Sequence, residues 1–188
     1  MLRVQPGVLT TTMAMTIVVA FARDAAPASV IAPLTPAQVH AVMTSPVRHV
    51  RGVGPHMTKL IAEGLRRSGT FAQLVLALNQ SDVIVYVETG RGLPSTISGR
   101  LLLAAGPNGQ RYLRIQVAGN TRPNELIALL GHELRHALEV AESPQVRDER
   151  TLIALYERIG HPGSGQHRYD TAAAQDTGRQ VRFELAGL

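Results

Sequence analysis

The chain of 188 residues contains no cysteine, and only 4% of its residues are aromatic. The absence of cysteine excludes disulfide bridges, thiolate metal ligands, a cysteine nucleophile and a lipoprotein anchor. Lysine is nearly absent too, since Lys59 is the only one. The net charge of +5 therefore comes from arginines, which are scattered along the chain and form no basic stripe with interleaved aromatic residues. Nucleic acid is not an expected partner of such a chain.

The first 28 residues have the three parts of a secretory signal peptide. Arg3 gives a positively charged start, Val8–Ala22 is an apolar run, and alanines at positions 20 and 22 and at positions 26 and 28 fit two cleavage sites. The run is shorter than the roughly 20 residues that a membrane-spanning helix needs. The sequence therefore predicts that residues 1–28 are cleaved, and that the mature protein is secreted or periplasmic with no stable membrane span. An uncleaved membrane anchor is the alternative.

Proline and alanine are frequent in residues 29–55, which indicates a linker or an extended lead-in with a short helix at Thr35–Met43. Residues 56–188 are expected to form one domain. Within it, the β-branched run Val83–Val87 is the clearest strand.

Two further apolar runs, Leu101–Ala105 and Arg111–Val117, flank an Asn-Gly pair, which is typical of a β-hairpin. Apolar residues at helical spacing, together with capping and breaking residues, predict the helices. The expected fold is α+β, with a sheet of about three strands, a long helix that ends near Glu142 and two C-terminal helices. The predicted helices span residues 57–68, 71–78, 120–142, 147–158 and 171–185.

His132, Glu133 and His136 form an H-E-x-x-H motif on the long helix. Because a helix has 3.6 residues per turn, the two imidazoles leave the same face and can bind one metal ion. Glu133 lies one step around the helix, from where its carboxylate can reach a metal-bound water without ligating the metal. Zinc lowers the pKa of such a water to about 7, and a glutamate can then accept its proton.

The segment Leu129–Glu139 resembles the active-site helix of zincin metallopeptidases, and the order of strand, hairpin and metal helix resembles their catalytic core. The resemblance implies a zinc-dependent peptidase that acts on a peptide or protein substrate, with Glu133 as the general base. It also implies that the outer strand of the hairpin, matched here to Arg111–Val117, pairs with an extended substrate. An inactive zincin-like module that binds metal or a partner in the cell envelope is the alternative function.

The third zinc ligand distinguishes the branches of that family. The metzincin pattern is excluded, because Glu142 stands where those proteins have a histidine and Glu139 stands at their glycine position. Tyr169–Ala173 resembles the gluzincin pattern, with Asp170 in place of the usual glutamate. The resemblance therefore implies His132, His136 and Asp170 as ligands, with a helix cap as the alternative role of Asp170.

Glu139 is the other carboxylate expected near the metal. It lies on the same helix face as both histidines, three residues after His136. We expect it to hydrogen-bond His136 as an outer partner, since ligating histidines commonly do so. Direct ligation of the metal is its alternative role. Tyr156 is expected in the core, with donation to a reaction intermediate as its alternative role.

Overall fold

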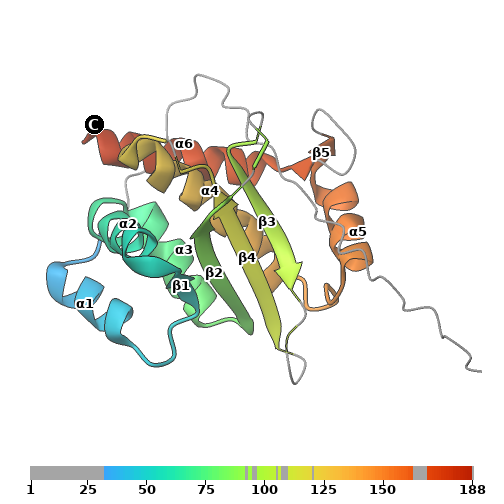
Figure 1. The fold of residues 1–188 in the computed structure, drawn as a ribbon, viewed down its shortest axis with the longest axis horizontal. Helices are drawn as coiled ribbons and strands as arrows, with labels where there is room; N and C mark the ends of the chain where they lie inside the picture. Colours follow the sequence, from blue (N-terminus) through green and yellow to red (C-terminus); the bar gives the residue numbers. More distant parts are fainter. Residues whose placement is uncertain are drawn as a thin grey trace, which may run out of the picture.

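The computed structural model describes residues 32–91, 93–94, 97–104, 106, 110–119, 121–162 and 169–187 (Figure 1). The predicted signal peptide, residues 1–28, lies outside these ranges, and so does the Asn-Gly pair at 108–109. Among the described residues, no helix is both long and apolar enough to cross a membrane.

The main sheet has four strands in the order β1-β2-β4-β3. Both contacts of β2 are parallel, whereas β3 and β4 are antiparallel, as the predicted hairpin requires. The sheet has one strand more than the three that the sequence predicted. Val50, inside the predicted lead-in, is buried and pairs with Val85, and the segment around it forms the extra strand. The strands are β1 (Val50–Gly52), β2 (Val83–Thr89), β3 (Gly99–Ala104) and β4 (Arg111–Val117).

The outer strand of the hairpin is β3, so the assignment of that position to Arg111–Val117 was wrong. That segment is β4, which lies between β2 and β3. The amide of Ala118 donates to the carbonyl of Ser98 (2.8 Å) at the start of the β3–β4 ladder. Bonded and non-bonded pairs alternate along an antiparallel ladder. The backbone groups of Gly99, Leu101 and Leu103 therefore point away from β4, toward the free side of β3.

Six helices and a two-stranded ribbon complete the described part of the chain. Val83, Val85 and Val87 are buried on β2 while the residues between them are partly exposed, so the helices cover one face of the sheet. The helices are α1 (Pro36–Thr44), α2 (Gly54–Arg67), α3 (Gly69–Asn79), α4 (Pro123–Ala141), α5 (Glu149–Ile159) and α6 (Ala172–Ala186). The ribbon pairs β5 (His161–Pro162) with β6 (Tyr169–Asp170).

Helices α4 and α6 pack closely along each other (Figure 1), so that Gly178 of α6 lies beside His132 of α4. Glycines allow the close approach. A Cβ on Gly131 would lie 2.8 Å from Val181 Cγ2, and one on Gly178 would lie 3.3 Å from His132 Cβ. Larger residues at these two positions would push the helices apart.

Arg111 fixes the other end of α4 against the sheet. Its guanidinium donates to the carbonyls of Val140 (2.6 Å) and Ala141 (3.1 Å) in the last turn of the helix, where carbonyls lack the full set of intrahelical donors, and to that of Ser143 (3.0 Å) just beyond it. The carboxylate of Asp82 pairs with the same guanidinium. This buried arginine therefore joins the C-terminus of α4 to the first residue of β4.

Candidate metal centre

His132 and His136 lie one turn apart in the middle of α4, and both side chains are fully buried. Their Nε2 atoms are 3.1 Å apart, with the rings nearly perpendicular. Helical spacing explains this convergence, because side chains at i and i+4 project from the same face. The sequence thus brings two ligand nitrogens to one point.

Asp170 completes a group of three potential ligands. Asp170 is the last residue of β6, and Thr171 alone separates it from α6. Its Oδ1 is 3.4 Å from His132 Nε2 and 3.6 Å from His136 Nε2. Two ligands each 2.0–2.1 Å from a tetrahedral ion are about 3.4 Å apart, so these separations fit one ion. The three buried residues form a group that could hold a metal ion.

Asp170 is held in place by its neighbours and does not cap α6. Its Oδ1 accepts a hydrogen bond from the amide of Thr171 (2.7 Å), and its Oδ2 accepts one from Gln175 (2.9 Å). The N-cap of α6 is Thr171, whose hydroxyl accepts a bond from the amide of Ala174. The alternative role of Asp170 as a helix cap is therefore not observed.

The two histidines differ in their protonation. Burial, together with the nearby positive charge of His136, lowers the pKa of His132 to about 3. Burial also disfavours the charged form of His136, but hydrogen bonds to Asp170 and Glu139 outweigh it and raise its pKa to about 9. Hydrogen bonding to His136 keeps the pKa of Asp170 below its usual value against the effect of burial. A metal ion would take the place of the proton on His136.

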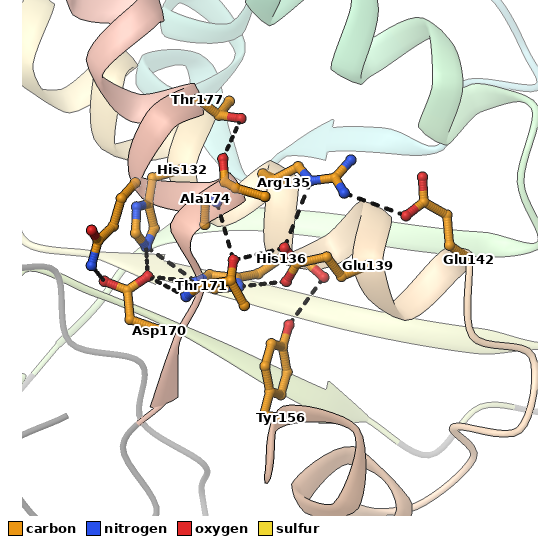
Figure 2. Close-up of polar contacts among 12 residues, drawn as sticks. His132, Arg135, His136, Glu139, Glu142, Tyr156, Asp170, Thr171, Ala174 and Thr177 are labelled. Carbon is orange, nitrogen blue, oxygen red and sulfur yellow. Dashed lines mark hydrogen bonds and ion pairs between the residues drawn. The ribbon is translucent and has the colours of Figure 1, made fainter. Parts of the chain in front are cut away.

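Glu139 lies on the other side of His136 from Asp170 (Figure 2). Its Oε2 is 2.9 Å from His136 Nδ1, and its Oε1 accepts a bond from the hydroxyl of Thr171 (2.7 Å). This is the arrangement expected of an outer carboxylate that orients a ligating histidine. Thr171 links the segment that carries Asp170 to the carboxylate that orients His136.

Tyr156 is a core residue behind His136. It is fully buried, its ring packs edge-on against His136 at a centroid distance of 5.3 Å, and its hydroxyl donates to the carbonyl of His136 (3.2 Å). Figure 2 shows the hydroxyl directed at Glu139, away from the three ligand atoms. The expectation of a core position for Tyr156 agrees with the structure.

Glu133 is buried and has no hydrogen-bond partner on either carboxylate oxygen within the described residues. Burial raises its pKa to about 8, against the opposing effect of His136. The carboxylate lies against the backbone of Gly99, where a Cβ would be only 2.5 Å from Glu133 Oε1. A buried carboxylate without donors is costly in the folded protein.

A cavity of about 340 Å³ lies between α4, α5 and the start of α6. Arg135, Glu139, Arg158 and Thr171 are among the residues that line it. None of His132, His136 and Asp170 lines it, so this cavity is separate from the three ligand atoms.

The chain shows no significant match to protein-family models, to curated proteins or to solved structures. The interpretation of the site therefore rests on its own residues. Two of them, Thr171 and Gly99, were not predicted from the sequence. The Asp-Thr pair just before α6 is a signal for Thr171, because threonine is a common N-cap. No local pattern points to Gly99, whose importance depends on a contact with a distant helix.

Proposed function

We propose that this protein is a zinc-dependent hydrolase, most specifically a metallopeptidase with a zincin-like core. The observation that carries the proposal is the group of His132, His136 and Asp170 beside an unpaired Glu133. Three protein ligands are typical of catalytic zinc sites, which keep the fourth position for water or substrate, whereas structural sites have four.

Zinc is the metal that we favour for this donor set. Two imidazole nitrogens and one carboxylate oxygen suit zinc, and the spacing of the three atoms matches a tetrahedral ion. The hydrogen bond that His136 Nδ1 donates to Glu139 supports the same choice, because it fixes the ring and leaves Nε2 for the metal.

Glu133 would act as the general base. Bound zinc would supply an activated water and a polarised substrate carbonyl. The carboxylate of Glu133 would accept a proton from that water and pass it to the leaving amine. Its pKa of about 8 applies without a metal, and a nearby cation favours the ionised form. His132, His136 and Asp170 would hold the ion, with Glu139 and Thr171 fixing their orientation.

A peptide is the substrate class that fits the sheet. The free side of β3 presents the backbone groups of Gly99, Leu101 and Leu103, and Gly99 contacts Glu133. An extended peptide can pair with such an edge, because main-chain hydrogen bonds provide affinity in this binding mode. A peptide bound there would pass over the Glu133 carboxylate.

We further propose that the protein is exported. An N-terminus near residue 29 in protein from its native host would support this.

An inactive metal-binding module of the cell envelope is the second candidate. The observation in its favour is burial, because His132, Glu133 and His136 are all 0% exposed. A turnover site needs access for a substrate, whereas a metal that only stabilises a fold does not.

Zinc analysis combined with a peptidase screen separates the two candidates. Purified mature protein should hold about one zinc per chain and cleave at least one member of a peptide library. Zinc at that ratio without any cleavage would favour the inactive module. A protein that contains no zinc and takes none up on titration would contradict both.

A further inference from the structure

Gly99 occupies a position where no side chain fits. An ideal Cβ at this residue would lie 2.5 Å from Oε1, 3.2 Å from Cδ and 3.3 Å from Cγ of Glu133. Its backbone is not in the left-handed region, since the positive φ values among the described glycines belong to Gly54 and Gly187. An alanine could therefore adopt the backbone conformation of Gly99, and the obstacle is Glu133.

The contact matters because little else locates the Glu133 carboxylate. Neither oxygen has a hydrogen-bond partner in the described part of the chain, and the side chain is fully buried. Steric contact with β3 is thus the restraint that remains. Gly99 is also buried at the first position of its strand, next to Ser98, whose carbonyl accepts a hydrogen bond from the amide of Ala118 (2.8 Å) and so ties the strand to β4.

We infer that Gly99 is a positioning residue, whose bare backbone sets where the carboxylate of Glu133 lies relative to His132, His136 and Asp170. The consequence for turnover rests on the proposed function, but the packing relation does not. A methyl group at position 99 must displace the carboxylate or push β3 away from α4, because a Cβ atom essentially never lies within 3.0 Å of another heavy atom to which it is not bonded.

A double-mutant cycle on the metal-free protein tests the packing relation. Gly99→Ala should lower the thermal unfolding midpoint of the wild-type chain but have little effect in a Glu133→Ala background, which lacks the three contacted atoms. Gly131→Ala is the matched control. Its Cβ meets Val181 and not Glu133, so it should lower the midpoint equally in both backgrounds. An equal loss for Gly99→Ala in the two backgrounds would overturn the inference.

The cobalt-substituted protein tests the position of the carboxylate without any assay of turnover. Gly99→Ala should bind cobalt as tightly as the wild type but shift its visible absorption bands, whereas Gly64→Ala, whose Cβ would meet Phe71 at 2.7 Å and no residue of the site, should leave them unchanged. Unchanged bands in Gly99→Ala would contradict the inference. If a substrate is found, kcat of Gly99→Ala should fall about 10–100-fold with KM nearly constant. Absence of a substrate would count against the proposed function alone, since the cycle and the spectrum stand without it.

Discussion

Glu184 and Glu133 are two carboxylates in the helical layer with opposite surroundings. Glu184, near the C-terminus of α6, accepts hydrogen bonds from Ser68 (2.5 Å), from the amide and hydroxyl of Thr70 (3.1 and 2.7 Å) and from Gln180 (3.0 Å). Burial raises its pKa, but these donors outweigh burial and hold the pKa below its usual value. Glu133 has no donor among the residues that the structure describes, and burial raises its pKa to about 8.

The comparison shows that Glu184 stabilises the fold through its hydrogen bonds, whereas burial of the unpaired Glu133 destabilises it. Ser68 and Thr70, which donate to Glu184, lie at the start of α3, so these bonds fix α6 against the neighbouring helix. A buried carboxylate left unpaired costs about 1–3 kcal/mol of folding free energy. We interpret the cost at Glu133 as the mark of a functional group.

The largest effect is expected from Glu133→Gln on turnover. Glutamine keeps the shape of the side chain but cannot accept a proton at neutral pH, so kcat should fall about 10²–10⁴-fold. The zinc content should not change, because the three proposed ligands are untouched. Glu184→Gln is the matched control and should retain nearly full kcat. Full turnover by Glu133→Gln on a confirmed substrate would contradict the role of general base proposed for Glu133.

Glu139→Gln should weaken metal binding by about 10–100-fold, the usual effect of removing an outer carboxylate from a ligating histidine. The physical reason is the loss of the charge that faces His136 Nδ1 at 2.9 Å. Competition with a chelator measures the affinity. Glu142→Gln provides the control, since that side chain is 55% exposed and lies 3.5 Å from Arg135. Equal affinities for the two variants would show that Glu139 does not orient the site.

Glu184→Gln should reduce the free energy of unfolding by about 1–3 kcal/mol, because it weakens hydrogen bonds to a charged acceptor. Glu125→Gln is a suitable comparison. Glu125 pairs with Arg182 at 2.7 Å but is 43% exposed, and such surface pairs contribute about 0–1 kcal/mol. Urea denaturation measures both variants. A smaller loss for Glu184→Gln than for Glu125→Gln would mean that the donors around Glu184 do not stabilise the fold.

The smallest effect, on the order of 1 kcal/mol per pH unit, concerns the metal-free protein. Folding raises the pKa of His136 from 6.5 to about 9 and that of Glu133 from 4.5 to about 8. Between pH 6.5 and 8 the folded protein therefore holds protons that the unfolded chain has lost, so stability should fall as the pH rises. His132, whose pKa is lowered, titrates below this range.

Zinc should abolish this decrease, since the metal takes the place of the proton on His136. The lowered pKa of Glu184 acts in the opposite direction. Its contribution is present above pH 4.5 and is lost on acidification through the folded pKa. Denaturation of chelator-treated protein, measured between pH 6.5 and 8 and again below pH 4.5, would distinguish the contribution of Glu133 from that of Glu184. A metal-free protein whose stability increases from pH 6.5 to 8 would contradict the protonation states given for the site.

Local spacing explains what the sequence predicted correctly. The placement of His132 and His136 on one helix face follows from 3.6 residues per turn, and Glu139 follows from the same geometry. The strand at Val83–Val87 and the antiparallel pairing of the hairpin also have local signals, in β-branched residues and an Asn-Gly pair. Asp170 was chosen by resemblance, and the structure brings it to the two histidines.

Features that depend on long-range packing were missed. β1 has only three residues and follows a proline-rich stretch, so neither its length nor its composition identifies it as a strand. The order β2-β4-β3 depends on which strand pairs in parallel with β2, and no turn signal specifies that choice. The contact of Gly99 with Glu133 joins an edge strand to a helix, and the bond from Thr171 to Glu139 spans 32 positions.

Anomalous diffraction at the zinc edge from crystals of the zinc-loaded protein is the most direct test of the metal centre. The account predicts one strong peak about 2.0–2.1 Å from Nε2 of His132, Nε2 of His136 and one carboxylate oxygen of Asp170. Crystals of Asp170→Ala grown at the same zinc concentration should show a much weaker peak or none. A wild-type crystal without zinc at this position, or with zinc bound only by other side chains, would contradict the account.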